Sequence, residues 1–140
     1  MIRLRIALLA VLIAGCQASP DRLHRSLGQF GGAEGLHQIS RALVERSADD
    51  PQIGHFFADV DLVNLADRLA EHMCVELDGP CTYTGQPMPE AHFALGIRES
   101  DFNRMVELLQ DIMDERGIDE SAQNTLLARL AESRGEVIRQ

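Results

Sequence analysis

A turn-rich stretch at residues 79–97 interrupts a chain that is otherwise patterned for helices. Glycine and proline cluster in its first half and forbid a continuous helix there. Pro89 suits the first position of a new helix, because its missing N–H would have no partner there anyway. We therefore expect a loop, followed by a short helical segment over residues 89–95 that Gly96 ends.

On both sides of this stretch, apolar residues recur every three or four positions, and no alternating strand pattern stands out. This periodicity is typical of amphipathic helices and predicts an all-α fold. A plain four-helix bundle fits the periodicity equally well. The helices are expected at residues 33–47, 61–77 and 99–116 and from residue 119 onward, with a short one at 22–27 and a turn after Pro51.

The short segment in the middle carries His92 among apolar neighbours, which are Ala91, Phe93, Leu95 and Ile97. A neutral imidazole in such a setting is either a core histidine or a metal ligand. The neighbouring sequence offers no partner ligands for zinc. Spacing alone therefore leaves both interpretations open.

The wider phrase contains Tyr83-Thr84-Gly85, Met88, Ala91-His92 and Gly96-Ile97, in that order. Together these residues resemble the haem-proximal segment of the group I truncated haemoglobins. Phe30-Gly31-Gly32 resembles the leading glycine motif of that family, and residues 50–58 resemble its corner segment. The resemblance runs from about Arg22 to Ile138. It implies the truncated globin two-over-two helical sandwich, which encloses haem b, with His92 as the proximal ligand of the iron.

The same resemblance implies a set of haem contacts. Judged without it, each apolar member is ordinary core, and Arg68 is part of a solvated helix face. In the family's arrangement Arg68 could reach a haem propionate and form a charge-assisted pair. The implied contacts are Phe57, Leu65, Arg68, Leu69, Tyr83, Met88, Ile97, Phe102 and Met105.

The distal side departs from the family pattern. Many members carry a tyrosine and a glutamine there, whereas the matching positions here are Val44, Leu65 and Leu69, and a one-residue slip gives Leu43. The lack of donors argues against tight oxygen binding and, with it, against the nitric-oxide dioxygenase activity of the family, which stays open. His72 lies one turn beyond Leu69. It is either a second candidate for the iron, a partly exposed surface histidine, or a histidine that bonds a nearby carbonyl.

The resemblance implies a globin that binds oxygen, nitric oxide or carbon monoxide at a histidine-ligated iron. A haem peroxidase or gas sensor and a cofactor-free helical interaction module remain as alternatives. The net charge of −9 opposes binding to nucleic acid. Catalysis and a reductase partner stay open.

The amino terminus has the layout of a secretory signal, with Arg3 and Arg5 before an apolar run over residues 6–14. The sequence Ile13-Ala14-Gly15-Cys16 resembles the lipobox of bacterial lipoproteins. The chain is thus expected to consist of a signal peptide at 1–15, a lipidated Cys16 opening a tether at 16–21, and a globin domain at 22–140. This predicts export to the periplasm and anchoring to the outer membrane of a Gram-negative bacterium. The alternative is an ordinary cleaved signal.

Two further cysteines, Cys74 and Cys81, match neither a Cys-x-x-Cys redox motif nor a haem attachment site. An exported protein meets an oxidising compartment, so we expect a disulfide between them. Two buried thiols are the alternative.

The anchoring hypothesis makes a direct prediction. The mature chain should begin at a lipidated Cys16, and Cys16→Ser should leave the precursor uncleaved at that site. Mass spectrometry of the mature protein is the measurement. An unmodified Cys16, or a soluble product that starts downstream, would contradict the lipoprotein assignment and leave the fold untouched.

Overall fold

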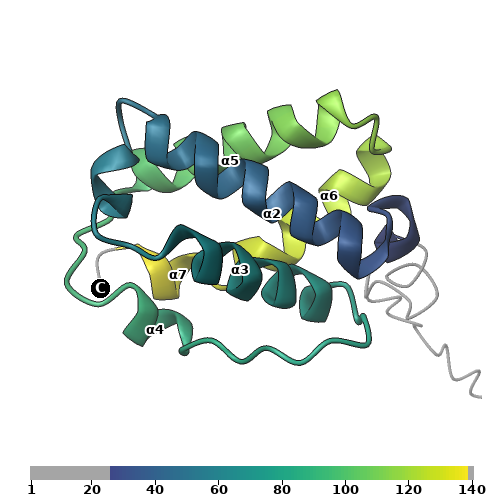
Figure 1. The fold of residues 1–140 in the computed structure, drawn as a ribbon, viewed down its shortest axis with the longest axis horizontal. Coiled ribbons are helices and arrows are strands. Elements are labelled where there is room, and N and C mark those ends of the chain that lie inside the picture. Colours follow the sequence, from purple (N-terminus) through teal and green to yellow (C-terminus); the bar gives the residue numbers. More distant parts are fainter. Residues whose placement is uncertain (1–25, 139–140) are drawn as a thin grey trace, which may run out of the picture.

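The computed structural model describes residues 26–138, and all regular elements of that range are helical (Figure 1). The prediction of an all-α fold is confirmed. The predicted signal peptide, Cys16, the tether and most of the predicted helix at 22–27 lie outside the described residues. The elements are α2 (Gly32–Asp49), η1 (Gly54–Phe57), α3 (Leu62–Glu76), α4 (Met88–Ala91), α5 (Glu99–Glu115), α6 (Glu120–Glu132) and α7 (Arg134–Val137).

The helices form two pairs, as in a two-over-two sandwich. The most extensive packing joins α2 to α3, and α5 lies against both α2 and α6. A long loop leaves the end of α3 and runs back along that helix, and α4, which follows it, lies close to α7 (Figure 1). The loop thereby places the start of the turn-rich stretch beside the second half of α3.

Local signals in the sequence set the helix ends. Asp61 caps α3, because its side chain accepts a hydrogen bond from the Asn64 N–H at 3.1 Å. Gly117 ends α5 in the left-handed region with φ 67°, and the Ile118 N–H then donates to the Met113 carbonyl at 3.0 Å. At the start of α2, a Cβ on Gly35 would lie 1.7 Å from the Phe30 carbonyl oxygen, so only glycine fits there.

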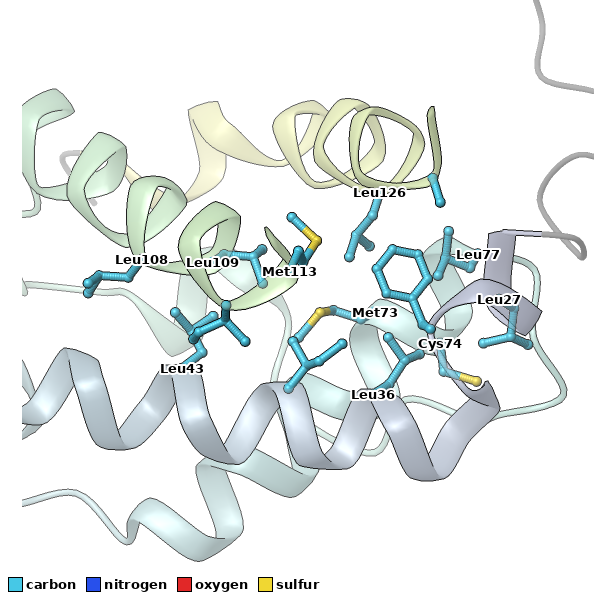
Figure 2. Packing of buried hydrophobic residues seen from close by; sticks show 14 of the residues in the cluster. Leu27, Leu36, Leu43, Met73, Cys74, Leu77, Leu108, Leu109, Met113 and Leu126 are labelled. Atoms are coloured by element: carbon cyan, nitrogen blue, oxygen red, sulfur yellow. The ribbon is translucent and has the colours of Figure 1, made fainter. Parts of the chain in front are cut away.

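The apolar core gathers between the first two-thirds of α2 and the second halves of α3 and α5, with α6 closing it (Figure 2). Its largest fully buried side chains are Leu36, Ile39, Leu43, Met73, Leu77, Ile112, Met113 and Leu126. The first halves of α3 and α5 contribute mainly half-buried apolar side chains instead. The opposite end of the molecule is therefore less densely packed, and α4 lies there.

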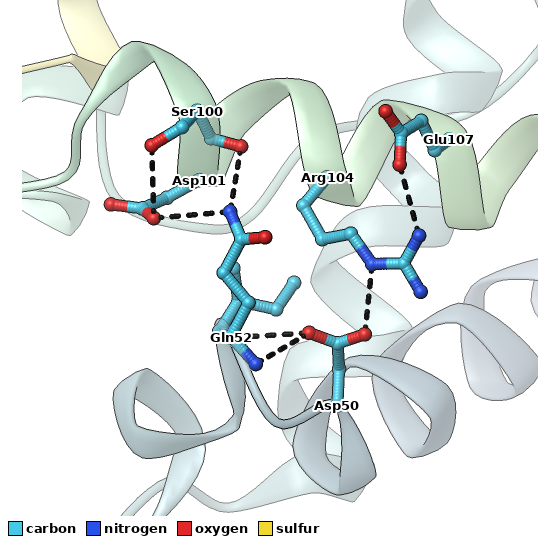
Figure 3. Close-up of polar contacts among 7 residues, drawn as sticks. Asp50, Gln52, Ser100, Asp101, Arg104 and Glu107 are labelled. Carbon is cyan, nitrogen blue, oxygen red and sulfur yellow. Dashed lines mark hydrogen bonds and ion pairs between the residues drawn. The ribbon is translucent and has the colours of Figure 1, made fainter.

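A polar network fixes the corner between α2 and η1 to α5 (Figure 3). The Asp50 carboxylate accepts hydrogen bonds from the N–H groups of Gln52 and Ile53, at 2.9 and 3.2 Å, and from Arg104 Nε at 2.9 Å. Burial opposes ionisation of Asp50, but the bonds from Arg104 and the two amides outweigh it and lower its pKa. Gln52 also donates to the Ser100 carbonyl at the start of α5.

Within residues 26–138, none of the helices is both long and apolar enough to cross a bilayer.

The lowered pKa of Asp50 predicts that the free energy of unfolding falls as the solution is made acidic. A depressed folded-state pKa gives stabilisation that is complete above the unfolded value, about 3.9, and is lost as the pH falls through the folded value. Asp50→Asn should therefore lower the free energy of unfolding at pH 7 and flatten its fall at acid pH. Urea denaturation across pH 3–7 measures this. Asp49→Asn, at the exposed neighbouring position, is the control. An equal fall in the free energy of unfolding at acid pH in all three proteins would contradict the role assigned to Asp50.

Candidate functional site

His92 lies directly after α4, as its C-cap residue, and is half-buried. Its Nδ1 is 2.8 Å from the Met88 carbonyl oxygen. A carbonyl oxygen only accepts, so Nδ1 carries the proton and donates. In the neutral ring Nε2 then keeps its lone pair and can ligate a metal, with the ring orientation fixed by the other nitrogen.

The helical segment that carries His92 is shorter than the predicted range of 89–95. α4 ends at Ala91. Beyond it the α-helical bonding pattern stops, because the N–H groups of Phe93 and Leu95 donate to carbonyls three residues back, those of Glu90 and His92. Ala94 then adopts φ 60° and Gly96 φ 65°, which lead the chain out of the helical direction. This leaves Phe93 exposed over 74 % of its surface, so this predicted apolar neighbour faces solvent.

The residues that the sequence assigned to haem contact share one degree of burial. Each is half-buried, and they come from η1, α3, the loop after α3, α4, the segment between α4 and α5, and α5. Phe57, Leu69 and Met105 also pack against the edge of the core. The full set is Phe57, Leu65, Arg68, Leu69, Tyr83, Met88, His92, Ile97, Phe102 and Met105.

Arg68 bears on whether these residues suit a haem group. Its Nη1 lies 3.1 Å from a Glu71 carboxylate oxygen, whereas its Nε is buried and has no hydrogen-bond partner among the described residues. A buried donor without an acceptor is costly, and a carboxylate such as a propionate would satisfy it. The half-buried apolar side chains, the oriented imidazole and this donor together fit haem.

His72, the second candidate for the iron, lies on α3 with its ring centroid 5.5 Å from that of Tyr83. Burial lowers the pKa of its imidazole, while the charge of Glu76 raises it and that of His92 lowers it further. His72 is thus a half-buried side chain near His92, with 13 % of its side chain exposed. Its Nδ1 lies 3.9 Å from Glu76, at the limit of an ion pair.

The distal positions place apolar side chains on two neighbouring helices. Val44 on α2 is 1 % exposed, and Leu65 and Leu69 on α3 are half-buried. The alternative position, Leu43, is also buried. These side chains lie on two helices that pack against each other, and none of them carries a hydrogen-bond donor.

A disulfide and a pair of hydrogen bonds attach the loop after α3 to that helix. Cys74 and Cys81 form a disulfide with Cα atoms 5.9 Å apart. Three residues further on, Thr84 donates from its N–H and its hydroxyl to Glu71, at 2.9 and 3.0 Å. Sequence analysis missed Glu71. Its spacing of three residues from Arg68 signals a helical ion pair, but nothing local signals its contact with Thr84.

A separate hollow of about 330 Å³ lies between the start of α2 and the corner after α5. It is lined by Phe30, Glu34, Gln38, Ile39, Arg116 and Ile118, among others, and Arg116 donates to Gln38 at 3.2 Å. None of the residues that line this hollow belongs to the predicted haem contacts, so the two features are distinct.

Comparison with known proteins identifies the class. The model of the bacterial-like globin family matches residues 27–139, and the chain belongs to that family. As a globin it is a haem-binding protein whose cofactor is haem iron. The match covers all the helices described above and both sides of the site.

Relatives within the family include the group 1 truncated haemoglobins. The chain is 29 % identical over 111 residues to GlbN of Nostoc commune, covering 78 % of this chain and 92 % of the relative. It is 27 % identical over 103 residues to GlbN of Mycolicibacterium paratuberculosis, covering 74 % and 76 %.

Solved structures confirm the predicted truncated globin sandwich. The truncated haemoglobin of Tetrahymena pyriformis in its Fe(III) form superposes with a TM-score of 0.78 at 20 % identity, covering 82 % of this chain and 98 % of that one. Chlamydomonas reinhardtii THB1 superposes with a TM-score of 0.66 at 22 % identity, covering 79 % and 93 %. At such identities the likeness concerns the fold alone.

Proposed function

We propose that this protein is a truncated globin that holds haem b through His92 and binds a diatomic gas, such as oxygen, nitric oxide or carbon monoxide. The observation that carries the proposal is the hydrogen bond from His92 Nδ1 to the Met88 carbonyl. It leaves Nε2 as the ligating atom and fixes the plane of the ring. When bound, the haem would supply an iron that can coordinate the gas.

The other side chains of the site would bind the haem group and orient it. Arg68 offers a buried Nε donor to a propionate, which fixes one edge of the cofactor. Phe57, Met88, Phe102 and Met105 offer apolar surface to the macrocycle and exclude water from it. The half-buried state of these side chains supports their role as the lining of such a site.

The distal side chains set the expected gas preference. Val44, Leu65 and Leu69 offer no hydrogen bond, so they hold oxygen only through apolar contact. We infer rapid release of oxygen and little discrimination against carbon monoxide. We further propose that the protein works at a lipid anchor on Cys16 in the periplasm, as the lipobox-like sequence indicates.

Replacing the proposed ligand tests the central assignment. His92→Ala should abolish haem binding or weaken it severely, because the imidazole that would ligate the iron and its orienting hydrogen bond are both lost. His72→Ala should leave the ferrous absorption spectrum nearly unchanged, and the exposed His55→Ala is the matched control. Absorption spectra after titration with haem decide the question. A His92→Ala protein with the spectrum of the unmodified chain would contradict the proposal.

Adding a distal donor tests the apolar pocket. Oxygen takes up more negative charge on binding than carbon monoxide does, and a hydrogen bond to a charged group contributes about 1.5–3 kcal/mol. Leu69→Gln should therefore slow oxygen dissociation roughly ten- to hundredfold and barely change that of carbon monoxide. Stopped-flow kinetics measure both rates.

Leu69→Met, of similar volume and without a donor, is the control and should leave both dissociation rates near those of the unmodified protein. Slow oxygen release from the unmodified protein that is lost in His72→Ala would show that His72 is the distal donor instead.

A further inference from the structure

The loop before His92 lies in register along α3. Cys74 on the helix is bonded to Cys81, His72 faces Tyr83, and Glu71 accepts from Thr84. Each step forward along the loop thus matches a step back along the helix. The loop is thereby directed toward the first half of α3, and α4 and His92 follow at its far end (Figure 1).

Glu71 makes the last of these three contacts between helix and loop, and it also has a partner on its own helix. Its Oε2 accepts from the Thr84 N–H at 2.9 Å and from the Thr84 hydroxyl at 3.0 Å. The same oxygen lies 3.1 Å from Arg68 Nη1. One carboxylate oxygen therefore joins the arginine offered to the cofactor and the loop that leads to the proposed iron ligand.

The carboxylate is suited to this connection. The hydrogen bond from the Thr84 N–H, with the hydroxyl bond and the charge of Arg68, outweighs burial and lowers the pKa of Glu71. Glu71 is therefore ionised at neutral pH and makes charge-assisted bonds to both partners. The side chains of Arg68 and Glu71 are 30 % and 21 % exposed, so their ion pair is partly shielded from water, whereas Thr84 lies at the exposed end of the contact.

The disulfide cannot replace this contact. It holds the loop at Cys81, whereas Thr84 is three residues closer to His92 along the chain. The intervening Thr82 is exposed. Glu71 also reaches Arg68, which the disulfide does not touch.

We propose that Glu71 is a positioning residue that holds Arg68 and the His92-bearing loop in a single arrangement and so sets the rate at which haem dissociates. This inference rests on the proposed function, because it takes His92 and Arg68 as groups that hold haem. Glu71 itself acts through these two residues.

The test measures haem transfer from the loaded protein to an excess of apomyoglobin. Glu71→Ala should raise the dissociation rate by about tenfold or more, because charge-assisted bonds to two partners are lost. Thr84→Val keeps the N–H and loses the hydroxyl, so a smaller rise is expected. Thr84→Ser keeps both donors and should restore the rate of the unmodified protein. Glu45→Ala, on the exposed face of α2, and Thr82→Val are the matched controls.

A spectroscopic readout separates positioning from a general loss of stability. Resonance Raman spectra of the ferrous protein should show a shifted or broadened iron–histidine band in Glu71→Ala, and an unshifted one in both controls. If Glu71→Ala fails to fold, the Thr84→Val and Thr84→Ser pair decides the question by the same two measurements.

A loaded Glu71→Ala protein, or Thr84→Val where that pair decides, with an unchanged dissociation rate and an unchanged band would overturn this inference alone. Failure of the unmodified chain to take up haem would overturn the proposed function and the inference together. Haem uptake by the unmodified chain therefore distinguishes the two failures.

Discussion

The site depends on how a very short helix is held in place. α4 has four residues, too few to be stable alone, so the position of His92 must come from attachments elsewhere. The loop before it is attached to α3 by the Cys74–Cys81 disulfide and the Glu71–Thr84 hydrogen bonds. Behind that, the core of α2, α3, α5 and α6 fixes α3 itself. The packed helices thus determine where His92 lies, because they hold the loop that leads to it.

Packing is divided between the two ends of the molecule. The second halves of α3 and α5 supply fully buried side chains to the core (Figure 2), whereas their first halves supply mainly half-buried ones. The network around the buried Asp50 stabilises the less densely packed end, because it joins the corner after α2 to α5 (Figure 3). A globin can therefore offer apolar surface to a cofactor without giving up its own core.

Much of the fold could be predicted from the sequence, because helix periodicity and end signals are local. The cap at Asp61 and the left-handed Gly117 agree with the helix boundaries expected at residues 61 and 116. The end of α4 was predicted wrongly, since the left-handed turn at Ala94 has no glycine or asparagine to announce it. The contacts that join Glu71 to Thr84 and Asp50 to Arg104 link distant segments, so no local pattern could indicate them. For His92, periodicity left its role open, and only the resemblance to truncated haemoglobins assigned it.

The most direct test of the account is a crystal structure of the protein loaded with haem. The account predicts the iron within bonding distance of His92 Nε2, with Nδ1 still donating to the Met88 carbonyl, a propionate at Arg68, and Leu65 and Leu69 on the opposite face. Iron coordinated by His72, or by no histidine, would contradict it.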